Sequence, residues 1–231
     1  MTSLFTFVHH RLVAQPRQWQ ALADRLTRDG GRRITEAGGT LYGIFRSQIG
    51  RPRDELQILT VWSQTKRAAD AEKALLAHDP DVLLASSELL LPTLRPTDTT
   101  PLSRQGNYAF RWFATPPENW PEFLDLCAEA WPGFEASYDS QVIGLWQAVG
   151  DRSGPTTDEV TGAGLQQGVR SLLLTRRPNL AMWERSKLPQ GFEEQAVRDK
   201  LSRRYDLCDW TVVSTATLLT AGDRPDTARW T

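Results

Sequence analysis

Apolar and polar residues run through the same order of patterns twice along this chain. Segments of strand length, rich in aromatic and β-branched residues, occur in the first half at 5–13, 40–48, 56–62 and 82–94. The second half has matching segments at 108–114, 141–149, 169–175 and 210–220. Between the strands, apolar residues recur at helical spacing. The predicted order in each half is therefore β-α-β-β-α-β, which is the order of a ferredoxin-like unit.

The first predicted helix of each half begins near a proline, at Pro16 and at Pro117. The two glycines at 30 and 31 are predicted to end the first of these helices. The remaining helices are predicted at 66–77 and, with an interruption at 189–191, at 179–204.

The two halves are related by a constant spacing in the sequence. Phe7 corresponds to Tyr108, Pro16 to Pro117, Trp19 to Trp120 and Gly43 to Gly144, and each difference in residue number equals 101. A register that holds without a gap from the first strand to the second indicates an internal repeat.

The repeat predicts how the two halves are packed. Right-handed crossovers place both helices of a half on one face of an antiparallel sheet, and the bare apolar face must be buried against another sheet. We therefore predict an α+β fold of two tandem ferredoxin-like βαββαβ repeats, packed sheet to sheet as an α+β barrel. The predicted divisions are a first half at 1–96, a linker at 97–103, a second half at 104–223 and a C-terminal tail at 224–231.

One connection differs between the halves. The tight turn at 50–54 is replaced in the second half by 151–168, which is rich in glycine, threonine and acidic residues. Loops of this length inside compact domains are commonly functional or disordered. Two interpretations stay open: a lid that closes over the mouth of the barrel when ligand binds, and a neutral surface insertion.

Composition narrows the classes of function. With 27 Lys and Arg against 28 Asp and Glu, the net charge of −1 gives no bulk electrostatic reason to expect a nucleic-acid or anionic membrane partner. Two cysteines are too few for a disulfide framework, and no apolar run reaches the ~20 residues of a membrane span. The N-terminus lacks the pattern of a signal peptide, and no zinc motif is present. We expect a soluble, cytoplasmic protein without a metal site.

His10 and Arg111 are the first candidates for chemistry, because they are equivalent under the repeat (111 − 10 = 101). Strand alternation places both on the face opposite that of Tyr108, Phe110 and Trp112. We assign the face of His10 and Arg111 to the barrel interior and the aromatic face to the layer beneath the helices.

Glu88 is the carboxylate predicted to complete this catalytic group. In the ferredoxin-like order the fourth strand lies beside the first, so Glu88 is placed to orient His10 as an acid–base residue. Arg111 would then hold an anionic group of the substrate. The alternatives are a solvated Glu88 on an edge strand and an Arg111 in a structural ion pair.

Four further side chains are predicted to line the cavity between the sheets and to bind substrate: Tyr42, Arg46, Trp62 and Arg177. Trp62 and Arg177 stand at equivalent ends of the third strand of each half. The first is apolar and the second cationic, which suits one asymmetric site built from two similar halves.

Two short motifs carry a resemblance to a known family. Tyr108, Phe110, Arg111 and Phe113, followed by a pair of prolines, resemble the opening strand of NIPSNAP-type domains. The segment 43–50 is similar to a second motif of that family, a Gly-aromatic pair leading to Glu-Ile-Gly. The chain departs from the family at three positions: Gln48 stands where the family commonly has Glu, Ile58 where it has His, and His10 where it has Arg.

The resemblance implies the dimeric α+β barrel superfamily, in which two ferredoxin-like sheets enclose a cavity. That superfamily includes cofactor-free oxygenases, small-molecule isomerases and cyclases, and haem enzymes such as chlorite dismutases. It implies a lyase, isomerase or oxygenase acting on a small molecule, and a possible homodimer.

The function predicted from these observations is acid–base or cofactor-free chemistry on an anionic or polar organic substrate, in the cavity between the sheets. A non-catalytic ligand-binding or adaptor module is the first alternative. The second is a haem-binding enzyme, for which His9 or His10 on the first strand would be the ligand of the iron.

Overall fold

The computed structural model describes residues 5–63, 70–76, 79–149 and 168–223. Residues 66–69 and 77 of the predicted helix at 66–77, nearly all of the predicted insertion at 151–168, and the whole tail at 224–231 lie outside the described residues.

Eight antiparallel strands form one closed barrel in the order β1-β3-β2-β8-β5-β7-β6-β4. Their bounds agree closely with the segments predicted from the sequence. They are β1 (Thr6–Ala14), β2 (Gly39–Ile49), β3 (Glu55–Trp62), β4 (Val82–Arg95), β5 (Asn107–Thr115), β6 (Gln141–Val149), β7 (Val169–Arg177) and β8 (Trp210–Leu218).

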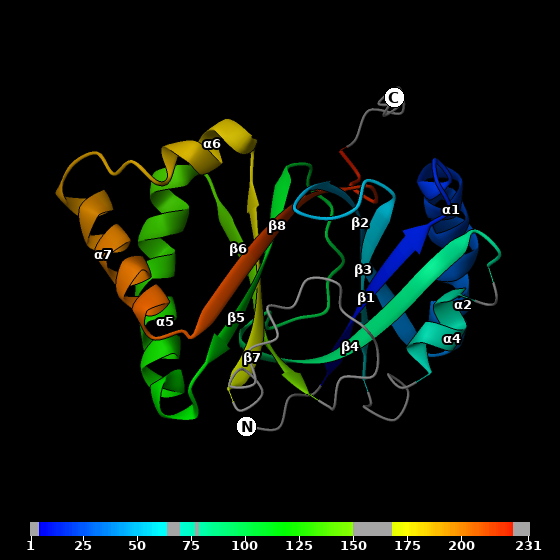
Figure 1. Ribbon diagram of the computed structural model, residues 1–231, viewed down its shortest axis with the longest axis horizontal. Coiled ribbons are helices and arrows are strands. Elements are labelled where there is room, and N and C mark those ends of the chain that lie inside the picture. The colour runs from blue at the N-terminus through cyan, green and yellow to red at the C-terminus, as the bar shows by residue number, and fades with distance from the viewer. Residues whose placement is uncertain (1–4, 64–69, 77–78, 150–167, 224–231) are drawn as a thin grey trace.

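The helices form two layers on opposite outer sides of the barrel (Figure 1). The first-half layer contains α1 (Trp19–Arg25), the π-helical turn η1 (Leu26–Gly30), α2 (Gly31–Glu36) and α4 (Ala71–Leu76). The second-half layer contains the 3₁₀ turn η2 (Pro117–Asn119), α5 (Trp120–Tyr138), α6 (Leu180–Arg185) and α7 (Phe192–Asp206).

The halves are joined edge to edge, by pairing of β2 with β8 and of β4 with β6. A single chain therefore supplies every strand of the barrel, and no edge needs a partner subunit. The predicted fold class, an α+β barrel of two ferredoxin-like units, is confirmed.

The helical path of the first half does not end at the two glycines, as the sequence had predicted. It continues through the π-helical turn into α2 and ends at Glu36. Gly30 is buried within this path, and a Cβ there would lie 3.4–3.5 Å from Leu26 and Leu75, which is ordinary van der Waals distance. The glycine therefore packs inside the helical path and does not break it.

The core is divided into three clusters by the barrel wall. The barrel interior holds large side chains from both halves, among them Phe7, Phe45, Phe110, Trp112 and Trp146. A second cluster packs beneath the first-half helices, and a third beneath the second-half helices.

This arrangement reverses the predicted assignment of strand faces. The aromatic face of Tyr108, Phe110 and Trp112 lies inside the barrel, while the neighbours of His10 and Arg111 on their own face lie beneath the helices. Alternation shows correctly which residues share a face, but does not show which face turns inward. The aromatic side chains occupy the interior because an eight-stranded barrel is just wide enough to be filled by side chains.

Among the described residues, no helix combines the length and apolar character that crossing a membrane requires.

Candidate functional site

A cavity of about 310 Å³ lies in the second half, between the barrel wall and the helices α5, α6 and α7. This volume is at the lower end of the range for small-molecule sites. The lining residues come from every strand and every α-helix of that half: Ala109, Arg111, Trp131, Phe134, Val142, Leu173, Thr175, Arg177, Trp183, Ser186, Lys187, Arg198, Leu201, Arg204, Tyr205 and Thr211. We refer to it as the cationic cavity.

Its charge is entirely positive. Five of the lining residues are Lys or Arg, and none of the residues that line it is Asp or Glu. Lys187 pairs with Glu184 at the surface, at 2.8 Å. Within the described ranges, Arg111, Arg177 and Arg204 have no carboxylate at ion-pair distance. An isolated buried charge costs several kcal/mol, so these guanidinium groups are available to an anionic ligand.

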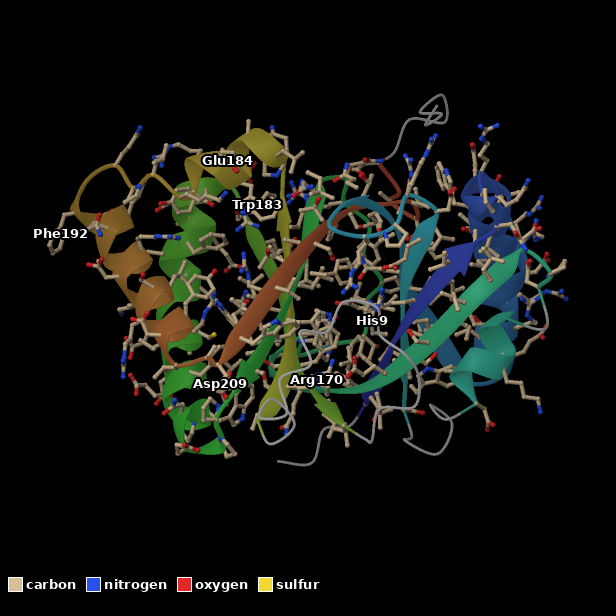
Figure 2. All side chains as sticks on the ribbon, in the orientation of Figure 1. His9, Arg170, Trp183, Glu184, Phe192 and Asp209 are labelled. Carbon is tan, nitrogen blue, oxygen red and sulfur yellow. The ribbon has the colours of Figure 1, made fainter. Side chains whose placement is uncertain are left out.

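Aromatic rings hold Arg177 in place at the end of β7. Its guanidinium carbon lies 5.1 Å from the ring centre of Phe134 and 5.8 Å from that of Trp183, which Figure 2 labels on α6. Its Nη1 donates to Thr175 Oγ1 at 3.0 Å. Burial first, and then the charge of Arg111, lower the pKa of Arg177 to about 10. The Arg177 guanidinium group therefore stays charged near neutral pH, and no carboxylate of the described residues lies at ion-pair distance to balance its charge.

Arg111 and Arg204 flank Tyr205, which lies in the last turn of α7. Their guanidinium carbons lie 5.3 Å and 5.1 Å from the Tyr205 ring centre. Burial lowers the pKa of Arg111, and the neighbouring arginines lower it further, although Tyr205 acts in the opposite direction. Burial alone would raise the pKa of the Tyr205 phenol, but the charges of Arg204 and Arg111 outweigh it and the net shift is downward.

Three buried N–H donors of the lining residues have no acceptor among the described residues: Trp131 Nε1, Arg177 Nε and Arg204 Nε. Buried donors are nearly always paired in native proteins, and leaving one unpaired costs about 1–3 kcal/mol. Unpaired buried polar atoms also occur elsewhere among the described residues, so these three donors agree with an acceptor-rich ligand but do not by themselves define its site.

Local sequence explains how the helices enclose this space. Pro178 follows Arg177 and ends β7, and Asn179 then caps α6 by accepting a hydrogen bond from Met182 N at 2.9 Å. Gly133 allows α7 to pack closely on α5, because a Cβ at that position would lie 2.6 Å from Val197. The helix α5 carries Trp131 and Phe134 on its inward face and continues through Pro132.

In the first half, the equivalent space beneath the helices is filled. Trp62 is paired with Thr6 as Arg177 is paired with Asn107, and Trp62 Nε1 donates to Thr60 as Arg177 donates to Thr175. The Trp62 indole packs in the first-half cluster and lies so close to Gly39 that a Cβ there would meet the ring at 2.9 Å. The cavity is therefore the open counterpart of a packed position.

The predicted pair of His10 and Glu88 does not form. The β1–β4 neighbourhood was predicted correctly, but the register places Ser87 opposite His10 and Glu88 opposite His9. His10 Nδ1 lies 2.8 Å from Ser87 Oγ and its Nε2 lies 3.1 Å from Thr60 Oγ1. Glu88 instead forms an ion pair with Arg170 on β7.

His9 occupies the middle of the barrel rather than a surface position (Figure 2). Its ring lies 5.6 Å from that of Phe110 and 5.9 Å from that of Trp112, and its Nε2 contacts Gln57 Oε1 at 3.1 Å. Burial lowers the pKa of both His9 and His10 to about 3, with the charge of Arg11 adding to the effect at His9. Both imidazoles are therefore neutral packing groups at neutral pH.

The remaining predicted binding residues are dispersed. Tyr42 packs in the barrel interior and borders a second cavity, of about 480 Å³, beside the linker. The Arg46 guanidinium carbon lies 4.2 Å from the ring centre of Trp19 beneath the first-half helices. Trp62 fills the position described above. Of the seven predicted site residues, the structure brings together only Arg111 and Arg177.

Sequence reasoning missed Arg204, Tyr205 and Trp183. A signal for the first two was present, because Val197, Leu201, Arg204, Tyr205 and Cys208 recur at the spacing of one helix face. The two apolar residues and the cysteine identify that face as inward, and its arginine and tyrosine are then marked as buried polar groups.

No family model matches the chain, and no curated protein matches it in sequence. Solved structures do resemble it. A protein of Fusobacterium nucleatum, described as a candidate monooxygenase, superposes with a TM-score of 0.59 at 10% identity, covering 95% of this chain and 94% of the other. A candidate chlorite dismutase gives a TM-score of 0.55 at 13% identity, covering 96% and 97%. A haem-binding protein of Thermus thermophilus gives 0.53 at 13% identity, covering 93% and 91%.

At these identities the likeness establishes the fold, which is that of the dimeric α+β barrel proteins. The NIPSNAP resemblance drawn from short motifs stays a prediction.

Proposed function

We propose that this protein is a small-molecule enzyme of the α+β barrel type, and that it binds an organic anion in the cationic cavity. The observation that carries the proposal is the set of guanidinium groups of half-buried Arg111 and buried Arg177 and Arg204, which line a cavity that has no carboxylate among its lining residues. The enzyme-like fold of the structural neighbours agrees with the proposal but does not identify the reaction.

The chemistry of the lining defines the ligand class. Guanidinium groups bind carboxylates with two parallel hydrogen bonds, and the side chains of Trp131, Phe134 and Trp183 offer apolar and aromatic surface beside them. A ligand with one or two carboxylates on an apolar or aromatic body satisfies both features. The hydroxyl groups of Ser186 and Thr211 are available to orient its polar substituents.

We expect calorimetry to show that benzoate and cyclohexanecarboxylate bind more tightly than the corresponding amides. Hydrogen bonds to charged groups contribute about 1.5–3 kcal/mol, so the difference should be about 10- to 150-fold in dissociation constant. Equal affinity for acid and amide would contradict an anion site.

A variant that fills the cavity provides the matched control. Arg177→Trp reproduces the residue found at Trp62, and Ser140→Gly reproduces Gly39, since 140 − 39 equals 101. The double variant should keep the fold, because the first half shows the same packing, and it should lose carboxylate binding. Binding that survives in a folded double variant would place the anion site elsewhere.

Haem is a second candidate for the same cavity, and the donor set decides how far it fits. The predicted histidine ligands do not fit, because both ring nitrogens of His10 contact hydroxyl groups and His9 is packed inside the barrel. Tyr205 fits, because tyrosine is a known ligand of haem iron and this phenol lines the cavity between two arginines. Arg111 and Arg177 would hold the propionates, and bound haem would supply redox chemistry at its iron.

This second candidate predicts that adding haemin produces a saturable shift of the main haem absorbance band, and that Tyr205→Phe changes the position of that band. The His10→Ala variant is the control and should leave the band of the wild-type complex in place. Absence of a saturable spectral change removes haem as the ligand and leaves the organic anion.

A further inference from the structure

Tyr205 differs chemically from the other residues of the cationic cavity. The remaining polar lining groups are cations, hydroxyl groups of Ser and Thr, and the indoles of Trp131 and Trp183. Apart from Lys187, whose ammonium group pairs with Glu184 at the surface, Tyr205 is thus the lining residue that can gain or lose a proton near the operating range of an enzyme. It projects from α7 on the same face as Leu201 and Arg204, and its ring stacks on Phe113 with centres 6.2 Å apart.

We propose that Tyr205 is the acid–base residue of the cationic cavity, and that it takes up a proton when an organic anion binds between the surrounding guanidinium groups. The inference rests on the proposed function, since it concerns the same ligand in the same cavity. It adds a proton-exchanging role for one named oxygen, which neither the fold nor the sequence assigns.

The charged groups that face Tyr205 are cationic on every side that the structure describes. Arg111 approaches from β5 and Arg177 from β7, while Arg198 and Arg204 belong to α7 itself. From α5 the neighbouring titratable group is the Cys127 thiol, which accepts from Arg204 Nη1 at 3.6 Å and whose pKa burial raises. These arginines stabilise the phenolate form in the absence of another anion.

A bound carboxylate changes this balance. It recruits the same guanidinium groups and adds a negative charge beside the phenolate, so the phenol form becomes favoured. The proton taken up by Tyr205 Oη comes from solvent or from an acidic C–H or O–H bond of the bound molecule. In the second case the electron pair of that bond stays on the ligand as an enolate or oxyanion, beside Arg111 and Arg204. The return of the proton completes the cycle without an oxidant or reductant.

The other tyrosines make this residue observable. The pKa of Tyr108 is raised to about 12 by burial, and burial also raises the pKa of Tyr42 and Tyr138. The chain contains only four tyrosines. Ultraviolet absorbance of tyrosinate therefore reports Tyr205 alone at the lower end of a pH titration.

The first experiment is a spectrophotometric pH titration of haem-free protein without ligand. The wild type should show one tyrosine that ionises before the others. Tyr205→Phe should lose this step, Arg111→Met should move its midpoint to higher pH, and Tyr138→Phe should leave it in place because that phenol donates to Glu194 outside the cavity. Absence of an early step in the folded wild type, or its persistence in Tyr205→Phe, overturns the proposal.

The second experiment repeats the titration with saturating cyclohexanecarboxylate, which has no near-ultraviolet absorbance of its own. The midpoint of the early step should rise by about 1–3 pH units, the range produced by a single charge nearby. If calorimetry shows that the probe binds but the midpoint does not move, the acid–base role is wrong while the anion site stands. If neither cyclohexanecarboxylate nor benzoate binds although the early step is present, the proposed function fails, and this inference fails with it.

Discussion

Replacing Arg111 by Met should weaken the binding of cyclohexanecarboxylate by about 10- to 150-fold. This is the range for removing a charge-assisted hydrogen bond of about 1.5–3 kcal/mol. Arg111 lines the cavity from β5 and has no carboxylate at ion-pair distance among the described residues. Its guanidinium group is therefore free to bind the ligand, and calorimetry of wild type and variant measures the loss directly.

The free energy of unfolding of the Arg111→Met variant should equal that of the wild type or exceed it. Burial lowers the pKa of Arg111 and nearby arginines lower it further, so its positive charge is less favourable there than in water. Replacing a buried charge with an apolar side chain of similar volume is often neutral or stabilising. A variant that binds less but unfolds at equal or higher denaturant concentration identifies a residue that serves binding rather than folding.

Arg46→Met is the matched control. Arg46 also lies beneath helices and is also held over an aromatic ring, at 4.2 Å from Trp19, but it belongs to the first half, away from the cavity. Its loss should leave carboxylate binding unchanged. Equal loss of binding in both variants would indicate a general effect on the fold and would contradict the assignment of the site.

The sequence predicted the strands and their order because periodicity records local burial, and β6 agrees with its predicted bounds at both ends. It also showed that His10 and Arg111 share one face. Periodicity does not show whether a strand face lies inside the barrel or beneath the helices, because both faces of β1 and β5 are buried. His10 and Arg111 were consequently assigned to the wrong compartment, although their equivalence is real.

The candidate site was only partly accessible to sequence reasoning for a related reason. Arg111 was identified by its equivalence to His10 and Arg177 by its equivalence to Trp62, and the structure places both on paired strands of one half. Arg204, Tyr205 and Trp183 come from helices whose position against the sheet depends on tertiary packing, including the close contact of Gly133 with Val197. The apolar residues of α7 mark its inward face, but they do not show which strands and helices that face meets.

The two halves show how a repeat can create one asymmetric site. The same ladder position carries Trp62 in the first half and Arg177 in the second, each hydrogen-bonded to a threonine two residues earlier. The indole fills its space, whereas the guanidinium group borders open volume and adds charge to it. A bulky apolar side chain at this ladder position therefore fills its surroundings, whereas a cationic side chain borders the cavity.

Acid should destabilise the folded protein, because His9 and His10 are both buried and neutral in it. Burial lowers the pKa of each to about 3, whereas an unfolded histidine titrates near 6.5. The unfolded state therefore binds protons at a higher pH than the folded state does. Stability from this source is fully present above about pH 6.5, and it is lost progressively as the pH falls toward about 3.

Urea unfolding should show this between about pH 6.5 and about pH 5, where most unperturbed carboxylates stay ionised. We expect the free energy of unfolding to fall by about 3 kcal/mol over this range, with each histidine contributing about half. The variants His9→Gln and His10→Gln should each be less stable than the wild type at neutral pH. In the first variant Gln57 loses the imidazole as a hydrogen-bond partner, and in the second Ser87 and Thr60 do. The stability of each variant should depend less steeply on pH than that of the wild type. If the pH dependence of stability is the same in the wild type and in both variants, the two imidazoles are not neutral in the folded protein.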